Sequence, residues 1–258
     1  MTYVEGMRAV VTGAGSGIGA AIARRLAAEG ARVVVNDLDA ERAHAVSASV
    51  GGVAAPGDAA TDEGAVALVR AAREALGGVD LFVANAGVGV GGGPAASDAD
   101  WDLAWQVNTM AHVRAARHVL PEWLERGRGH FVATVSAAGL LTMPGAAPYA
   151  VTKHAALAFA EWLAITYGGR GVRVQALCPQ GVRTPMLSAS GDLGRAILEP
   201  DAVEPDAVAE LTVASLEDGP FLILPHPEVA RYSAARAADP DAWLAGMRRR
   251  TSTLPLQH

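Results

Sequence analysis

The stretch RAVVTGAGSGIGAAIARRL, residues 8–26, decides the fold that we expect for this 258-residue chain. It opens with a short β-branched run, which is typical of a strand. It ends with Ile18, Ile22 and Leu26 on one face of a helix. Glycines connect the two parts. The stretch therefore predicts a strand, a tight turn and a helix in immediate succession.

The same alternation continues along the whole chain. Short apolar runs alternate with longer alanine-rich stretches, and residues 79–84 are apolar at nearly every position. Such runs are typical of a parallel sheet covered by helices on both faces. We expect an α/β fold, a doubly wound parallel sheet of about seven strands, in a single domain over residues 1–258. Residues 188–205 are expected to form a loop over the substrate, and residues 226–258 a C-terminal helical extension.

The glycine turn lies where such a sheet binds ligands. Right-handed crossovers place the carboxyl ends of all strands at one edge, and Thr12–Gly19 (TGAGSGIG) follows the first strand. Glycines let the backbone approach a pyrophosphate, whose charge meets the N–H groups and the positive dipole end of the helix. The turn predicts a dinucleotide site; a purely structural turn is the alternative.

An acid at the end of the second strand bears on the choice of dinucleotide. Asp37 follows Gly19 by 18 residues (37 − 19), where a carboxylate can accept hydrogen bonds from an adenosine ribose and repel a 2'-phosphate. No arginine lies in the glycine turn or at that strand end, and Arg42 lies five residues on. The pattern favours NAD over NADP. Capping a helix is the alternative role for Asp37, although Asp39 suits it better.

The segment PYAVTK, residues 148–153, contains the only lysine of the chain, although 21 residues are Lys or Arg. Pro148 suits the first turn of a helix, so Tyr149 and Lys153 fall four positions apart on one face. A neighbouring ammonium favours the phenolate, so we expect Lys153 to lower the pKa of Tyr149 toward neutrality. Tyr149 could then act as a general acid and base.

Two polar residues complete the set of candidates. Ser136 ends the fifth strand, where it could bind a substrate oxygen; a turn or capping serine is the alternative. Asn108 interrupts an apolar helix expected over residues 98–125, and in isolation it would be a satisfied core residue.

Together these motifs resemble the short-chain dehydrogenase/reductase family, over about residues 7–186. TGxxxGxG is present at Thr12–Gly19, Asn-Ala-Gly at 85–87 and Tyr-x-x-x-Lys at 149–153, with the serine and the asparagine in the family's order and spacing. The resemblance implies a Rossmann-type fold and an oxidoreductase that uses a nicotinamide dinucleotide.

The resemblance also implies a role for each residue. Tyr149 would be the general acid/base, Lys153 would lower its pKa and bind the nicotinamide ribose, Ser136 would orient the substrate oxygen, and Asn108 would hold a water in a proton relay. The cofactor contacts so implied are Gly13, Ser16, Gly17, Ile18, Gly19, Asp37, Asp58, Asn85, Ala86, Gly87, Tyr149, Lys153, Pro179, Val182 and Thr184.

The chain departs from the family pattern at two places. Gln180 stands where the family has a glycine after a proline, and the C-terminal part lacks the glycine-rich ending of many tetrameric relatives. A homodimer is still expected, with a tetramer as the alternative, because the helix 154–169 is apolar nearly all round. Tryptophans 101, 105 and 123 could join that surface or pack in the core.

Composition excludes several classes. A net charge of −6 gives no reason to expect nucleic acid as a partner, and residues 131–152, although uncharged, contain glycines and prolines that speak against a membrane helix. The single cysteine, Cys178, excludes an internal disulfide and is expected to be buried; a cytoplasmic location fits best. The seven histidines lack metal-ligand spacing, so no metal is expected.

The leading hypothesis is an NAD(H)-dependent enzyme that interconverts a secondary alcohol and a ketone. A catalytically silent NAD-binding regulator and a 3-oxoacyl carrier-protein reductase are the alternatives. Apolar residues at positions 140, 141, 143, 186 and 187 flank the expected pocket, where they could bind an apolar substrate or pack a closing loop.

Overall fold

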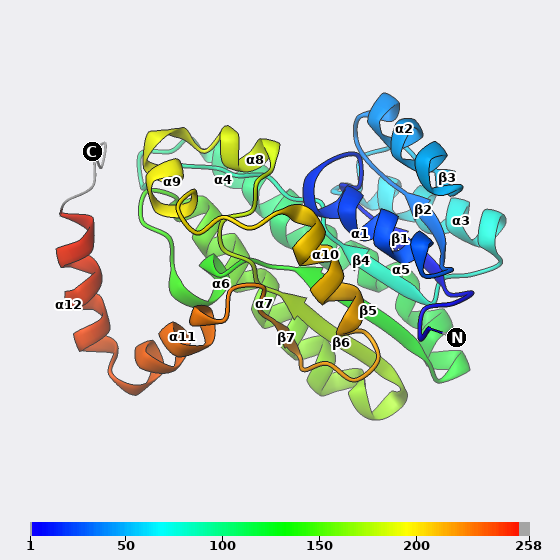
Figure 1. The fold of residues 1–258 in the computed structure, drawn as a ribbon. Helices are drawn as coiled ribbons and strands as arrows, with labels where there is room; N and C mark the ends of the chain where they lie inside the picture. Colours follow the sequence, from blue (N-terminus) through cyan, green and yellow to red (C-terminus); the bar gives the residue numbers. More distant parts are fainter. Residues whose placement is uncertain (1, 253–258) are drawn as a thin grey trace.

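A seven-stranded parallel sheet forms the centre of the molecule, in a computed structural model that describes residues 2–252 (Figure 1). The strand order is β3-β2-β1-β4-β5-β6-β7, and every neighbouring pair is parallel. The predicted doubly wound sheet is therefore confirmed. The strands are β1 Arg8–Val11, β2 Arg32–Val35, β3 Val53–Ala54, β4 Leu81–Ala84, β5 Gly129–Thr134, β6 Val172–Leu177 and β7 Leu222–Ile223.

Helices cover both faces of the sheet, and each face has its own apolar core. One core joins the sheet to α3 (Asp62–Leu76), α5 (Ala111–Arg126) and α7 (Ala147–Tyr167). The other joins it to α1 (Gly17–Ala28), α2 (Ala40–Val50) and α10 (Pro205–Ala214). All four residues of β4 are buried, as a central parallel strand requires.

The helix expected over residues 98–125 is interrupted. It consists of α4 (Asp98–Trp105), a π-helical turn η1 (Gln106–Met110) and α5. Single π-helical turns within α-helices are frequent at functional sites, and Asn108 lies in this one. Trp123 is fully buried and donates its indole N–H to the Val79 carbonyl at 2.7 Å, so it belongs to the core and not to an outer surface.

Several short helices lie in the part of the chain that follows β5. Residues 188–205, where we expected a loop, include α9 (Gly191–Leu198), because Leu193 and Ile197 share one helix face. The remaining elements are α6 (Ala138–Leu141), η2 (Gly168–Arg170) and α8 (Pro185–Ser188).

The C-terminal part forms α11 (Glu228–Ala238) and α12 (Pro240–Thr251), which lead away from the sheet (Figure 1, orange and red). Residues 253–258 of the expected extension lie outside the described residues. Within residues 2–252, no helix combines the length and the apolar character needed to cross a membrane.

Candidate active site

The ends of β1 and β4 are joined by hydrogen bonds around Thr12. Its hydroxyl accepts the backbone N–H groups of Asn85 (2.9 Å) and Ala86 (3.0 Å). The Asn85 side-chain amide donates to the carbonyls of Thr12 (2.9 Å) and Gly13 (3.3 Å). The Asn85 amide therefore holds the glycine turn in place. Thr12 was not among the predicted site residues, although it opens the glycine motif.

The glycine turn has no room for side chains. A Cβ on Gly13 would lie 2.8 Å from Ala86 Cα, one on Gly17 would lie 3.0 Å from Thr184 Cγ2, and one on Gly19 would lie 2.4 Å from the Gly13 carbonyl oxygen. Gly13 and Gly17 also have φ of +59° and +52°, which favour glycine. The loops after β1, β4 and β6 therefore meet along this turn.

The start of α1 is suited to bind an anion. Its N-cap residue Ser16 has extended backbone and makes no side-chain cap hydrogen bond, and no acidic residue lies in the first turn. The first N–H groups of a helix need partners from outside it, and they favour negative charge. Ile18 lies in this first turn and is partly exposed. The site therefore fits the pyrophosphate of a dinucleotide.

Asp37 faces the glycine turn from the end of β2. Its Oδ2 accepts the Gly15 N–H at 2.8 Å, and its Oδ1 accepts the Asp39 N–H at 3.0 Å. Asp39 caps α2, as expected, by accepting the Arg42 N–H at 3.1 Å. The Arg42 guanidinium lies 3.0 Å from Asp39 Oδ2 and 3.6 Å from Asp37 Oδ1, closer to Asp37 than the sequence suggested.

Asp58 follows β3 on the same edge of the sheet. It is exposed, and its carboxylate accepts the Ala60 N–H at 2.9 Å. The Asn36 side chain donates to the Ala55 and Gly57 carbonyls, at 2.8 and 3.1 Å. These bonds hold the Asp58 loop beside the end of β2.

Ser136, Tyr149 and Lys153 meet where β5 faces α7. The Ser136 hydroxyl lies close enough to the Tyr149 phenol to lower the pKa of that phenol. The Lys153 Nζ donates to the Thr134 carbonyl at 3.0 Å and lies 5.7 Å from the centre of the Tyr149 ring. Pro148 occupies the first turn of α7, as predicted. The three polar side chains therefore lie together, and the Thr134 carbonyl is a partner that the sequence did not reveal.

The expected direction of the Tyr149 pKa is wrong. Burial raises the pKa of Tyr149, and the nearby Ser136 hydroxyl lowers it only in part. Burial also lowers the pKa of Lys153 to about 8, because its ammonium is nearly solvent-free. Burial is thus the largest cause of the pKa shift for both groups. Cys178, buried nearby as expected, has a thiol whose pKa burial raises to about 12.

Asn108 uses its side chain within the protein. Its Oδ1 accepts the Val88 N–H at 2.9 Å, and its Nδ2 donates to the Val88 carbonyl (3.0 Å) and to Thr152 Oγ1 (3.2 Å). A Cβ on Gly87 would lie 3.3 Å from Asn108 Oδ1 and 3.5 Å from Lys153 Nζ. Asn108 therefore positions the chain after the Asn-Ala-Gly motif beside Lys153, and its role in holding a water stays a prediction.

The loop after β6 contacts both Ser136 and the glycine turn. The Pro179 carbonyl accepts the Ala137 N–H at 2.8 Å and the Ser136 hydroxyl at 3.4 Å. Val182 is buried, and its carbonyl accepts the Thr184 hydroxyl at 3.1 Å. Thr184 lies against Gly17, so this loop connects the serine to the glycine turn.

Gln180, the residue that departs from the family pattern, is bound by the C-terminal segment. Its backbone N–H donates to His226 Nδ1 at 3.1 Å, and His226 Nε2 donates to the Asp201 carbonyl at 3.2 Å. The Gln180 side chain also donates to Glu228. His226 is buried and connects three segments: the loop after β6, the end of α9 and the start of α11.

Replacing His226 by leucine is expected to lower the free energy of unfolding, because His226 connects these three segments. The Gln180 N–H would lose its acceptor and the Asp201 carbonyl its donor, which costs about 1–3 kcal/mol of unfolding free energy for buried groups. Urea unfolding measures this loss. The control is His44→Leu, at an exposed position of α2, for which no change is expected. Equal stability of both variants would contradict a structural role for His226.

Gly19→Ala is expected to damage the glycine turn. The new methyl group would collide with the Gly13 carbonyl and the Asn85 amide, each 2.4 Å away, and overpacking of this kind costs about 1–3 kcal/mol. NADH binding, followed by fluorescence, should weaken at least about tenfold. Gly168→Ala is the matched control, because a Cβ there meets no atom within 4 Å. A Gly19→Ala protein that binds NADH normally would show that this turn does not bind the dinucleotide.

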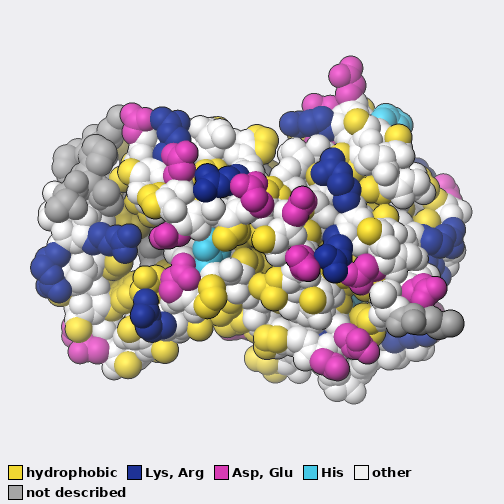
Figure 2. Space-filling view, viewed as in Figure 1, with side chains coloured by type: hydrophobic (Ala, Val, Ile, Leu, Met, Phe, Trp, Pro, Cys, Tyr) yellow, Lys and Arg dark blue, Asp and Glu magenta, His cyan; other side chains and the backbone are white. Residues whose placement is uncertain are grey.

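A cavity of about 550 Å³ lies beside Thr184. It is lined by Arg183, Thr184, Pro185, Leu187, Ser188, Arg195 and Glu199. Both arginines are already paired, Arg183 with Glu204 at 3.0 Å and Arg195 with Asp192 at 2.5 Å. On the face drawn in Figure 2, arginine and acidic side chains likewise lie next to one another. The cavity lining therefore combines polar and apolar groups, and its two arginines are paired with acidic residues.

Comparison with known proteins agrees with this geometry. The family profile described as short chain dehydrogenase matches residues 7–192. The chain is 38% identical over 199 residues to a 1-deoxy-11-beta-hydroxypentalenate dehydrogenase of Streptomyces exfoliatus, covering 72% of this chain and 70% of the relative.

Two solved structures extend the comparison. A short chain dehydrogenase/reductase from Burkholderia phymatum in complex with NAD superposes with a TM-score of 0.86, at 28% identity over 94% of this chain and 96% of the other. The L-sorbose reductase of Gluconobacter frateurii, complexed with NADPH and L-sorbose, gives a TM-score of 0.76 at 28% identity, over 85% and 95% of the two chains. The chain therefore belongs to the short-chain dehydrogenase family and is an oxidoreductase for alcohol- or ketone-type substrates.

Proposed function

We propose that the protein is an NAD(H)-dependent enzyme that interconverts a secondary alcohol and a ketone, with Tyr149 as general acid and base. The observation that carries this proposal is the contact of Ser136 with Tyr149 beside the buried Lys153, at the sheet edge that also holds the glycine turn. When bound, the dinucleotide supplies or accepts the hydride.

The side chains have separate tasks in this reaction. The Ser136 hydroxyl, already held by the Pro179 carbonyl, positions the substrate oxygen next to the phenol. Tyr149 takes the proton from an alcohol or gives it to a ketone oxygen. The ammonium of Lys153, fixed on the Thr134 carbonyl, favours the phenolate form when the alcohol is oxidised.

Preference for NAD is supported by the placement of Asp37. Its carboxylate lies at the glycine turn, where a 2'-phosphate would be repelled and a ribose hydroxyl could donate to it. Titration of the protein with NADH and with NADPH, followed by nicotinamide fluorescence, tests this preference. NADH should bind at least about tenfold more tightly; equal or tighter NADPH binding would overturn the preference.

The variant Asp37→Ser tests the role of Asp37 in the preference for NADH over NADPH. The substitution removes the repelling charge and leaves Arg42, which lies 3.6 Å from that carboxylate and 3.0 Å from Asp39, next to the place where a 2'-phosphate could pair with it. NADPH binding should therefore strengthen while NADH binding weakens. Glu41→Ser, which removes an exposed acidic side chain from the same turn of α2, is the control and should leave the ratio of the two affinities unchanged.

A homodimer is proposed through the outer face of α7. This helix exposes half of the Val151 and Trp162 side chains and 84% of Ile165, and α4, which packs against α7, exposes Leu103 and Trp105. Sedimentation should show a dimer or tetramer that Ile165→Glu dissociates. A monomeric wild-type protein would remove this proposal. The cytoplasmic location stays a prediction.

A further inference from the structure

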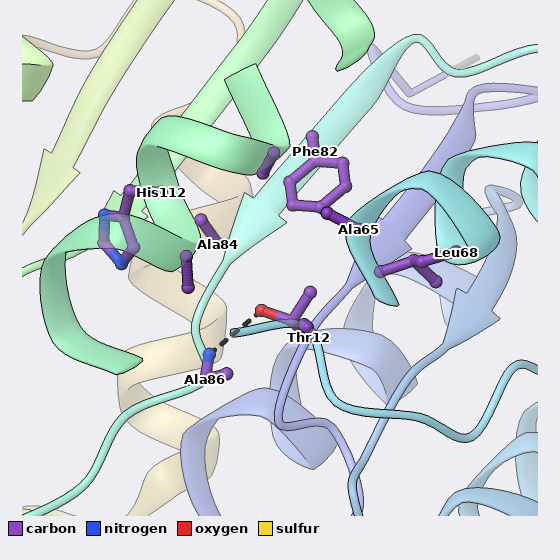
Figure 3. A pocket seen from close by; sticks show the side chains of 10 residues that line it. Thr12, Ala65, Leu68, Phe82, Ala84, Ala86 and His112 are labelled. Carbon is purple, nitrogen blue, oxygen red and sulfur yellow. Dashed lines mark hydrogen bonds between the residues drawn. The ribbon is translucent and has the colours of Figure 1, made fainter. Parts of the chain in front are cut away.

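The Ser136 hydroxyl is held differently from the glycine turn. The turn is held by bonds between the ends of two neighbouring strands, such as the one from the Ala86 N–H to the Thr12 hydroxyl (Figure 3). The Ser136 hydroxyl instead accepts the Ala138 N–H at 3.1 Å and donates to the Pro179 carbonyl at 3.4 Å. Ala138 begins α6, and Pro179 lies in the loop after β6. The position of Ser136 therefore depends on where α6 and this loop lie.

Helix α11 is hydrogen-bonded to both α6 and the loop after β6. At its start, Glu228 accepts a hydrogen bond from the side chain of Gln180, the residue that follows Pro179. Near its end, the guanidinium of Arg236 donates to the Leu140 carbonyl in α6. The helices α6 and α11 also pack against each other (Figure 1). One helix of the C-terminal part therefore contacts the two segments that bind the serine hydroxyl.

Arg236 has a backbone carbonyl as its partner and not a carboxylate. Among residues 2–252, this partly buried guanidinium forms no ion pair and no hydrogen bond besides the one to Leu140. The last carbonyls of a helix lack partners within it, and an arginine side chain can satisfy them. Helix α6 has only four residues, so it has little stability of its own. The bond from Arg236 therefore fixes the end of α6.

We propose that Arg236 is a positioning residue for the reaction and acts on Ser136 through α6. Helix α11 holds α6 near one of its ends and the loop after β6 near the other, and so keeps both partners of the serine hydroxyl in place. Loss of the Arg236 bond would therefore displace the serine and leave the glycine turn unchanged. The effect on catalysis rests on the function proposed for Ser136, whereas the effect on α6 does not.

Hydrogen–deuterium exchange of the full-length protein tests the effect on α6 without any substrate. The N–H groups of residues 139–141 donate to the carbonyls of Ser136 and Ala137, so their exchange reports on this turn. We expect Arg236→Ala to exchange several-fold faster at these three residues and at the wild-type rate over α7. Unchanged exchange at residues 139–141 would overturn the proposal, whatever the activity of the enzyme.

Kinetics with NAD and an alcohol that the wild-type protein oxidises tests the effect on the reaction. Arg236→Ala should lower kcat about 10- to 100-fold, because a displacement of about 1 Å near the reacting atoms can cost about 100-fold. The KM for NAD and the affinity for NADH should keep their wild-type values, since the glycine turn has hydrogen bonds of its own. Arg236→Lys, whose ammonium can still donate to the Leu140 carbonyl, should recover most of the lost rate.

Arg231→Ala is the matched control. Arg231 is exposed on the same helix, with its guanidinium over the Tyr232 ring, so its loss should change neither exchange nor kcat. A wild-type kcat in Arg236→Ala, or an equal loss of kcat and NADH binding, would overturn the positioning role. A wild-type protein that oxidises no alcohol would refute the proposed function instead, and the exchange measurement alone would then decide whether Arg236 holds α6.

Discussion

Tyr149→Phe is expected to lower kcat by about 10²–10⁴-fold, the range that general acid–base catalysis contributes. The substitution removes only the phenolic oxygen, the atom that Ser136 contacts and that would exchange the proton with the substrate. The fold and the glycine turn lie outside this change, so NADH affinity should be retained. Rates are measured with NAD and a secondary alcohol identified by screening at mildly alkaline pH.

Tyr167→Phe is the control for this prediction. Tyr167 ends the same helix, packs edge-on against Trp162 and lies away from Ser136, so loss of its hydroxyl should leave kcat unchanged. Turnover that survives Tyr149→Phe would contradict the proposed mechanism. A protein that binds NADH tightly but oxidises no alcohol, with Tyr149 intact, would instead support a regulatory function.

The pH dependence of oxidation follows from the direction of the Tyr149 pKa. Because burial raises the pKa of Tyr149, the phenolate is scarce near neutral pH. The base form becomes available as pH rises, so the kcat/KM for alcohol oxidation should increase from neutral to alkaline pH. A profile that is flat above neutrality in the wild-type protein would show that another group takes the proton.

Lys153→Arg is expected to lower kcat/KM by about 100-fold or more, although charge is conserved. The Lys153 ammonium is almost completely buried and lies 3.0 Å from the Thr134 carbonyl, and a Cβ on Gly87 would be only 3.5 Å from it. A planar guanidinium is larger than an ammonium and cannot act there as a compact point donor. Displacement of about 1 Å at such a site can cost about 100-fold in rate.

Circular dichroism and NADH titration separate this effect from misfolding. Arg170→Lys, at the exposed end of the same helical segment, is the control and should behave like the wild-type protein. Wild-type activity in Lys153→Arg would mean that the chain retains its only lysine for a reason other than catalysis.

The sequence by itself determined the features that depend on local spacing. Alternating apolar runs and helical stretches predicted the parallel sheet, because burial on both faces leaves a continuous apolar pattern in each strand. The glycine motif predicted the turn at the start of α1, since side chains are sterically excluded there. A separation of four residues placed Tyr149 and Lys153 on one helix face, because the helix period is local geometry.

Only the tertiary structure decided what depends on distant neighbours. The direction of the Tyr149 pKa, the partners of Asn108 and the contact of Gln180 with His226 all arise between residues tens of positions apart. A sequence pattern contains the residue types but not the depth of burial or the free hydrogen-bonding capacity around them. Desolvation depends on that three-dimensional surrounding, and it is the largest cause of the pKa shifts of both Tyr149 and Lys153.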